Sequence, residues 1–509
     1  MHYKRVVKIF TILLISLGII SLYIIKLNTI PTSVHGDEGE TALQALKIVT
    51  RSVNIFGVGW FDLPILSFAP HALGMAIFGE NAVGNRMGSV IFGLLTLPVF
   101  YLLLKLLFTP RIAFFATILL GTSHMWLALS RVGITYVQAT FLALITLYFL
   151  FKAIKKEHMI YFFVAGCFMG LSLYSYYAVR IIPIMILPIF IHYVKKFSLN
   201  KVLNLFIFTL GVLVIFAPQG KFFLDHPETF FSRTKSVYIF SDSGRKWTNY
   251  QKSESEIIFE QTKKTFNIFA GDNSTQYGFK GQLIDYTTLV FLCLGLFYGA
   301  KRFFSFPYSF LFLWLFLAIL GQIFTTVPTP IFLPRFVISL PVLFTFVALG
   351  IEMFIQHIKG KNNHRIIAAS LIITMIGSNL YTYFFIYPNQ VVGDLNARAA
   401  TKISYYLQSL PPSTRIIFVT PYEGYSNFGT LRFLAPESNR TDLIFNNYSQ
   451  NNTVLGSSII RNKSSVYILY PQYYFKVDEL KSIFPDGRIF DIKDINGSTQ
   501  FFIFKTQTF

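Results

Sequence analysis

Runs of about 20 mostly apolar residues recur along this 509-residue chain, and they restrict its fold more than any other feature. A helix needs about 20 such residues to cross the roughly 30 Å hydrocarbon layer of a bilayer. Only 13% of the residues are charged, about half the roughly 25% that is usual in globular proteins, which excludes a water-soluble multidomain enzyme. The abundant apolar surface also excludes a disordered chain. The sequence therefore predicts a polytopic α-helical membrane protein.

About 11 segments meet this length criterion and are predicted to be transmembrane helices. They are 9–26, 82–107, 112–129, 134–151, 159–178, 181–194, 202–217, 286–300, 308–325, 336–356 and 366–386. Short cytoplasmic loops of membrane proteins are enriched in Lys and Arg. With the N-terminus inside, every second loop is cytoplasmic, and these loops are rich in Lys and Arg and poor in acidic residues along the whole series. This places most of the net charge of +20 at the cytoplasmic surface. We therefore expect a multi-pass protein of the cell membrane with a cytoplasmic N-terminus, and no nucleic-acid partner.

Three regions are then expected on the non-cytoplasmic side: a loop at about 28–81, a second at about 218–285, and the chain after Tyr387. We divide the chain into a transmembrane domain, 1–387, and a small extracytoplasmic α/β domain, 388–509. In the second domain, short β-rich runs alternate with helical patterns. The predicted strands are Ile416–Thr420, Ser465–Tyr470, Arg488–Ile492 and Phe501–Lys505, and the predicted helices are Leu395–Leu410 and Val477–Phe484.

The first outer loop begins with an acidic pair, Asp37 and Glu38, ahead of an amphipathic helical pattern that could lie at the membrane surface. A carboxylate held there could act as a general base on an acceptor hydroxyl. The same residues also fit a structural role, because Asp37 followed by Glu40 matches a capping box at the start of a helix. The spacing alone leaves both roles open.

Four arginines lie at the outer ends of predicted spans, embedded in apolar sequence: Arg86, Arg131, Arg180 and Arg335. The excess of basic residues on the cytoplasmic side makes arginine less expected there. Four of them on one face favour a site for an anion such as a phosphate, which a guanidinium binds through paired hydrogen bonds. Each could instead extend to lipid headgroups or pair with an acid of an outer loop.

Other outer residues could also contribute to a site. His35 and His71 share the first outer loop with Glu38, so a divalent metal ion could bind there, although their spacing is not that of a ligand motif. The second loop contains Arg233 and the segment with Asp272 and Asn273, which would suit a substrate loop or a solvated connector. Tyr174, Tyr176 and Tyr177 precede Arg180 and could form an aromatic lining, or belong to an interfacial aromatic belt.

Other classes of membrane protein find less support in the sequence. No Walker A motif is present, which disfavours a nucleotide-driven pump. The spans lack a repeated filter-like segment, so a channel is poorly supported. Only one broken-helix candidate occurs, around Pro183 and Pro188, whereas inverted-repeat transporters need matched pairs.

The order of these motifs resembles that of the GT-C membrane glycosyltransferases, in particular the family 39 and protein O-mannosyltransferase-like group that includes the aminoarabinose transferases. The resemblance rests on the motifs His35-Gly-Asp-Glu-Gly39, Leu63-Pro-Ile-Leu66, Phe78-Gly-Glu80, Asn85-Arg-Met-Gly-Ser89, Ser130-Arg131, Tyr176-Tyr-Ala-Val-Arg180, Gly271-Asp-Asn273 and Pro334-Arg335. It covers about 1–390. The double proline that is usual in the group is a single Pro64 here.

The resemblance implies a sugar donor linked to polyprenyl phosphate and a reaction that inverts the anomeric centre. Asp37 would take the proton of the acceptor hydroxyl, Glu38 would support the site or a metal ion, and the outer arginines would stabilise the leaving phosphate. The expected acceptor is a lipid, a protein or a polysaccharide on the non-cytoplasmic face. A non-catalytic lipid-linked sugar binder, or a flippase that holds the phosphate with the same arginines, is the alternative.

Overall fold

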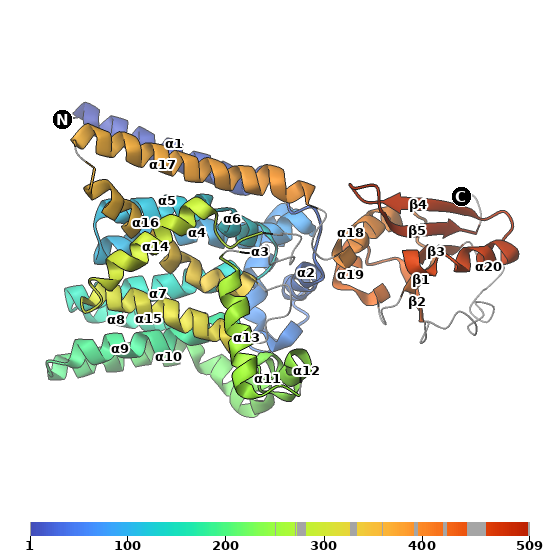
Figure 1. The fold of residues 1–509 in the computed structure, drawn as a ribbon. Helices are drawn as coiled ribbons and strands as arrows, with labels where there is room; N and C mark the ends of the chain where they lie inside the picture. The colour runs from blue at the N-terminus through green and yellow to red at the C-terminus, as the bar shows by residue number, and fades with distance from the viewer. Residues whose placement is uncertain are drawn as a thin grey trace.

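The computed structural model describes residues 2–249, 251–269, 271, 281–325, 333–358, 360–390, 395–420, 425–444 and 465–506. These residues form a large helical bundle, and a small sheet with its own helices lies beyond one end of the bundle, next to α2 (Figure 1). The predicted class, a helical membrane protein with a small C-terminal α/β unit, is confirmed.

The bundle and its outer segments contain the following α-helices, in chain order. They are α1 (His2–Ile24), α2 (Gly36–Val49), α3 (Ala69–Phe78), α4 (Ala82–Leu107), α5 (Pro110–Thr122), α6 (His124–Arg131), α7 (Tyr136–Lys156), α8 (Met159–Ser172), α9 (Ile182–Val194), α10 (Leu199–Asp225), α11 (Pro227–Val237), α12 (Asp242–Thr248), α13 (Glu254–Asn267), α14 (Tyr286–Ala300), α15 (Phe306–Ile323), α16 (Leu340–Gln356) and α17 (Lys361–Tyr381). Each predicted span coincides with one of these helices or with a consecutive pair.

The predicted count of 11 spans is not confirmed. Among the described residues, seven helices are long and apolar enough to cross a membrane, or eight if the bent pair α5–α6 is one span. The apolar parts of three further predicted spans are shorter than this criterion: Leu13–Ile24, Met159–Ser172 and Tyr286–Ala300. A fourth short apolar segment, Ile65–Phe78, belongs to the predicted first outer loop and was not anticipated.

The predicted span 112–129 is interrupted at Ser123. This residue ends α5 in an extended conformation and caps α6, its hydroxyl accepting a hydrogen bond from the Trp126 backbone N–H at 3.2 Å. The two helices are bent by 58° at the break. The predicted span ran across Gly121-Thr-Ser-His124 because the apolar residues on both sides together reach the length of a span.

Close backbone contacts hold the long helices together. A Cβ atom on Gly295 of α14 would lie 1.7 Å from the Phe346 carbonyl oxygen of α16, and one on Gly350 would lie 2.0 Å from that of Phe291. Small residues let helices approach this closely in membrane proteins, where apolar side chains gain little from leaving lipid. The mostly buried helix α16 is thereby fixed at the centre of the bundle.

The C-terminal unit is a five-stranded mixed sheet in the order β2-β1-β3-β5-β4. Its elements are α18 (Leu395–Gln408), β1 (Arg415–Thr420), α19 (Gly429–Leu434), β2 (Asn439–Ile444), β3 (Ser465–Leu469), α20 (Lys476–Ile483), β4 (Arg488–Lys493) and β5 (Thr499–Lys505). Strand β1 is parallel to β2 and β3, whereas β5 is antiparallel to β3 and β4. The four predicted strands and two helices are confirmed. Edge strand β2 was missed because its sequence, Asn-Arg-Thr-Asp-Leu-Ile, starts with four polar residues.

Helix α19 of this unit packs directly on α2. A Cβ atom on Gly39 would lie 2.4 Å from the carbonyl group of Gly429, so the two helix backbones touch. The Val34 carbonyl oxygen, just before α2, accepts a hydrogen bond from Thr430 at 2.9 Å, and the Val34 N–H donates one to Thr401 at 3.0 Å. The C-terminal unit is therefore fixed against the helix that carries the acidic pair.

Candidate functional site

Helix α2 begins at Gly36, two residues earlier than the capping-box hypothesis requires. Its N-cap is His35, whose Nδ1 accepts a hydrogen bond from the Asp37 N–H at 3.0 Å. The hypothesis that Asp37 caps the helix is therefore wrong: Asp37 is the second helical residue, and its side chain keeps 26% of its surface exposed. Histidine is not among the common N-cap residues, so this cap was not predicted from the sequence.

Glu40 does not complete a capping box either. Its carboxylate pairs with Arg432 of α19 at 3.0 Å, across the contact between α2 and the C-terminal unit. Burial raises the pKa of the Glu40 carboxyl above its ordinary value, and the nearby Arg432 guanidinium opposes that shift. Glu40 thus belongs to the docking contact.

Glu38 is fully buried and holds α2 in place. Its carboxylate accepts hydrogen bonds from Arg86 Nε at 2.7 Å and from the Gly133 N–H at 3.1 Å. The other guanidinium nitrogens of Arg86 donate to three carbonyl oxygens of the segment between α1 and α2: those of Leu27, Pro31 and Ser33. A charge buried this deeply is stable only when paired and hydrogen-bonded. The Glu38–Arg86 pair therefore holds the segment between α1 and α2 in place, and with it the position of Asp37.

Two further residues complete the buried network below α2. The Asn85 amide donates to the carbonyl oxygens of Glu38 and Gly133, each at 3.1 Å. The Asn85 carbonyl oxygen lies 2.8 Å from Nδ1 of His71. Burial lowers the pKa of the His71 imidazole to about 4, so near pH 7 the ring is neutral and its Nδ1–H donates to that carbonyl.

The metal-binding hypothesis finds no support in this geometry. Within the residues that the structure describes, no group of three His, Cys, Asp or Glu side chains could hold a metal ion. Glu38 faces a guanidinium, and His71 uses Nδ1 on a backbone carbonyl.

Arg131 has an environment like that of Arg86. It is fully buried and donates to the carbonyl oxygens of Leu22, Ile25 and Ile30, near the C-terminal end of α1. A cation is favourable where the last carbonyls of a helix lack partners. Arg131 thus binds the backbone at the end of the first predicted span, and Arg86 binds the segment that follows it.

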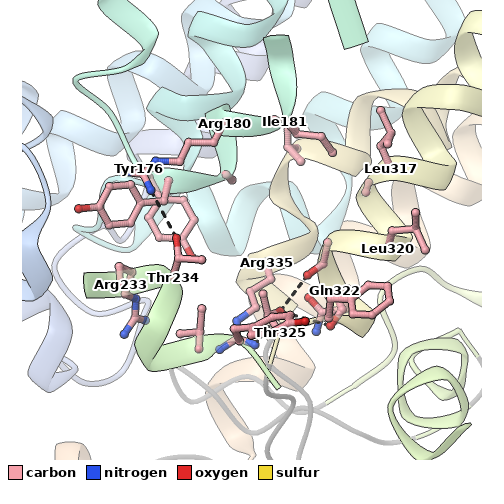
Figure 2. Close-up of a pocket in the computed structure, with 18 of the residues that line it drawn as sticks. Tyr176, Arg180, Ile181, Arg233, Thr234, Leu317, Leu320, Gln322, Thr325 and Arg335 are labelled. Atoms are coloured by element: carbon pink, nitrogen blue, oxygen red, sulfur yellow. Dashed lines mark hydrogen bonds between the residues drawn. The ribbon is translucent and has the colours of Figure 1, made fainter. Parts of the chain in front are cut away.

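The other two predicted arginines meet at a cavity of about 480 Å³, together with Arg233 (Figure 2). Arg180 belongs to a short 3₁₀ helix, Tyr177–Ile181, Arg233 to α11, and Arg335 to the 3₁₀ helix Leu333–Ser339. The remaining wall is largely apolar, with Ile181, Leu317 and Leu320 among its residues, and no Asp or Glu is part of the described wall. The cavity therefore combines three cations with an apolar lining.

Aromatic rings and hydroxyl groups hold these guanidinium groups at the cavity. Arg180 lies between the rings of Tyr177 and Phe230, at 4.1 and 4.2 Å from their centroids, and donates to Thr234 at 3.4 Å. Arg335 donates to Thr325 at 3.1 Å. Arg233 lies 4.3 Å from the centroid of the Phe61 ring. Cation–π contacts of this kind orient a guanidinium and leave its N–H groups able to bind an anion.

The first outer loop connects α2 to this cavity. Phe61 and Asp62 both have left-handed backbone conformations, with φ of 55° and 54°, which non-glycine residues rarely adopt. The Tyr177 hydroxyl donates to the Asp62 carbonyl oxygen, and the Ser232 hydroxyl donates to the Asp62 carboxylate. Two strained residues in a row are thus held by the elements that carry Arg180 and Arg233, a pattern that clusters at functional sites.

The structure divides the predicted arginines into two groups, and Asp37 belongs to neither. Arg180, Arg233 and Arg335 share the cavity, whereas Arg86 and Arg131 lie with Glu38 in the buried network around α1 and α2. Asp272 and Asn273 lie outside the described residues. The sequence did not single out Asp62 or the cavity residue Gln322, because neither belongs to a recognisable motif.

The chain is similar to a known protein family and to several solved structures. Residues 62–221 match the family model described as dolichyl-phosphate-mannose-protein mannosyltransferase. A search of curated proteins finds no match. Similar solved structures include ArnT from Cupriavidus metallidurans in the apo state, which is 13% identical in sequence, covers 98% of each chain and has a TM-score of 0.60.

Two more structures show the same fold. ArnT bound to undecaprenyl phosphate is 12% identical, with 97% of this chain and 98% of that chain covered and a TM-score of 0.55. The apo oligosaccharyltransferase of Archaeoglobus fulgidus is 14% identical, with 97% and 74% covered and a TM-score of 0.53. The matches confirm the resemblance seen in the sequence: this chain has the fold of the GT-C membrane glycosyltransferases, and its residues 62–221 match the protein mannosyltransferase family.

Proposed function

We propose that the protein transfers a sugar from a polyprenyl-phosphate carrier to an acceptor hydroxyl at the membrane surface. One observation carries the proposal: three arginines from three separate elements converge on one largely apolar cavity. Such a cavity suits an amphiphilic anion, because guanidinium groups bind phosphate oxygens and the apolar wall accommodates a lipid chain. The fold adds support, since ArnT has been solved with undecaprenyl phosphate and the Archaeoglobus fulgidus enzyme with a dolichol-phosphate.

In the proposed reaction the acceptor oxygen attacks the anomeric carbon of the donor sugar. The bond between that carbon and the phosphate oxygen breaks on the opposite face, so the configuration is inverted and polyprenyl phosphate leaves. Arg180, Arg233 and Arg335 stabilise the charge that develops on the leaving phosphate. Asp37, partly exposed at the start of α2, accepts the proton of the acceptor hydroxyl. Glu38 and Arg86 act as positioning residues, because both are buried against each other.

We further propose that α2, the cavity and the C-terminal unit all face the non-cytoplasmic side of the cell membrane. The alternation of basic loops supports this orientation. The C-terminal unit, residues 388–509 as predicted, would position the acceptor, which is a lipid, a protein or a polysaccharide. Its support is the direct contact of α19 with α2, the helix that carries Asp37.

A non-catalytic binder or flippase for lipid-linked sugars remains the competing function, and the comparisons do not favour it because the matched family and folds are those of transferases. Mass spectrometry of membranes with and without the protein separates the two functions. A transferase yields a new glycosylated lipid, protein or polysaccharide together with free polyprenyl phosphate. A flippase moves the lipid-linked sugar across the membrane and yields no such product.

Neutralising the cavity arginines is expected to weaken lipid phosphate binding. For each of Arg180→Gln, Arg233→Gln and Arg335→Gln, the Kd for undecaprenyl phosphate should rise about tenfold or more, because each removes a charge-assisted hydrogen bond worth roughly 1.5–3 kcal/mol. Titration of the lipid phosphate into the purified protein in nanodiscs, followed by native mass spectrometry, measures this change.

Arg245→Gln serves as the matched control for these variants. Arg245 belongs to the neighbouring helix α12, pairs with Glu254 at 3.2 Å and is not part of the cavity wall. Arg245→Gln removes the same charge as the cavity variants but no group of the cavity wall. Its Kd for undecaprenyl phosphate should therefore stay within about twofold of wild type, a much smaller change than the loss of a charge-assisted hydrogen bond causes. If the three cavity variants behave like this control, the cavity is not the phosphate site.

A further inference from the structure

Gln322 is a cavity residue with unused hydrogen-bonding capacity. It lies near the C-terminal end of α15 and is 2% exposed. Figure 2 shows it beside Arg335, on the side of the cavity away from Arg180 and Arg233. Within the described part of the chain, neither its Oε1 nor its Nε2 has a hydrogen-bond partner.

This arrangement requires an explanation, because buried amide groups in folded proteins nearly always have partners. The neighbouring hydroxyls in the wall are already engaged: Thr234 accepts from Arg180, and Thr325 accepts from Arg335. Gln322 retains two donors and an acceptor oxygen. Such a group at a ligand cavity is stabilised when the ligand supplies the missing partners.

The chemistry of the amide distinguishes its ligand from that of the arginines. An ionised phosphate only accepts hydrogen bonds, so it could pair with the amide N–H groups but would leave the amide oxygen without a partner. A sugar hydroxyl both donates and accepts, which matches an amide that presents an N–H and a carbonyl together. The two amide atoms are themselves covered, so binding includes a rotation of the side chain toward the cavity.

We propose that Gln322 is a specificity-determining residue that binds a hydroxyl group of the donor sugar, while the arginines bind the phosphate. This inference rests on the proposed function. It assigns the sugar-binding part of the cavity to the end of α15, a segment in which the sequence indicated no functional residue. A site that hydrogen-bonds a substrate hydroxyl also discriminates strongly against analogues that lack it.

The test compares lipid phosphate with and without a sugar. Undecaprenyl phosphate and three of its monosaccharide conjugates, carrying a hexose, an N-acetylhexosamine and a pentose, are titrated into wild type and Gln322→Met in nanodiscs. Met is close to Gln in length but has no amide. Wild type should bind at least one conjugate more tightly than undecaprenyl phosphate. In Gln322→Met, the Kd for that conjugate should rise roughly tenfold, whereas the Kd for undecaprenyl phosphate should stay within about twofold of wild type.

Gln219 provides the matched control. It is fully buried in α10, both of its amide atoms also lack partners within the described residues, and it is not part of the cavity wall. Gln219→Met should leave the Kd of every probe within about twofold of wild type, since no ligand contact is lost. A thermal melt verifies that each variant is folded, and Gln322→Leu replaces Gln322→Met if the latter is not.

The outcomes separate the inference from the function on which it rests. If the Gln322 variant binds undecaprenyl phosphate and its conjugates more weakly by the same factor, Gln322 has a packing role and the inference is overturned. An unchanged affinity for every conjugate also overturns it, as does a wild type that binds no conjugate more tightly than undecaprenyl phosphate. If instead the cavity arginine variants retain full affinity for undecaprenyl phosphate, the proposed function itself fails.

Discussion

Replacing Asp37 with Asn is expected to reduce the rate of sugar transfer by roughly 10²- to 10⁴-fold, the usual contribution of a positioned general base. Asn keeps the size of the side chain but cannot accept the proton of the acceptor hydroxyl. Asp37 is not the helix cap, because His35 has that role, so the substitution should leave α2 intact. The initial rate at saturating donor and acceptor measures the loss.

Glu80→Gln is the control for this substitution. Glu80 is an exposed carboxylate of the same outer loop, between α3 and α4, and the same change from acid to amide there should leave the rate within about twofold. Asp37→Asn should also bind undecaprenyl phosphate as wild type does, since Asp37 is not part of the cavity wall. Transfer by Asp37→Asn at a near wild-type rate would remove Asp37 from the mechanism.

Breaking the Glu38–Arg86 pair is expected to lower the free energy of unfolding by about 3–5 kcal/mol, the usual cost of leaving one partner of a buried ion pair uncompensated. Arg86→Gln leaves the fully buried Glu38 carboxylate without its guanidinium and also removes donors from the carbonyl groups of Leu27, Pro31 and Ser33. Denaturant unfolding in mixed micelles, followed by tryptophan fluorescence, measures the difference.

An exposed ion pair calibrates this measurement. Lys221 and Asp225 are 2.9 Å apart on α10, with 77% and 54% of their side-chain surfaces exposed. Lys221→Ala should change the free energy of unfolding by no more than about 1 kcal/mol, because exposed pairs contribute little. A comparably small change in Arg86→Gln would mean that the buried pair does not hold α2 in place.

Apolar length predicted the positions of the helices well but not how many of them span. Segments such as 82–107 have one interpretation, and the structure contains the same helix, α4. The break at Ser123 and the short apolar part of α8 depend on capping and on neighbouring helices, which a hydropathy pattern does not contain. In the C-terminal unit, strands with apolar runs were predicted, whereas polar edge strand β2 was not.

The arginines show why a site is harder to predict than a span. Arg86 and Arg180 have the same sequence signature, a basic residue at the outer end of an apolar segment. Arg86 meets a carboxylate and carbonyl groups 48 to 59 positions away, whereas Arg180 stacks on Tyr177 and Phe230 at the cavity. Only the folded arrangement distinguishes these environments, and it also places Arg233 at the cavity, whereas the sequence left it in a substrate loop or a solvated connector.

The most direct test of the central claim is an electron cryomicroscopy structure of the protein in nanodiscs with undecaprenyl phosphate. We predict phosphate density within hydrogen-bonding distance of at least two of Arg180, Arg233 and Arg335, with the lipid chain along the apolar wall of the cavity. Phosphate density beside Arg86 or Arg131 instead, or a cavity without lipid density at a saturating concentration, would contradict it.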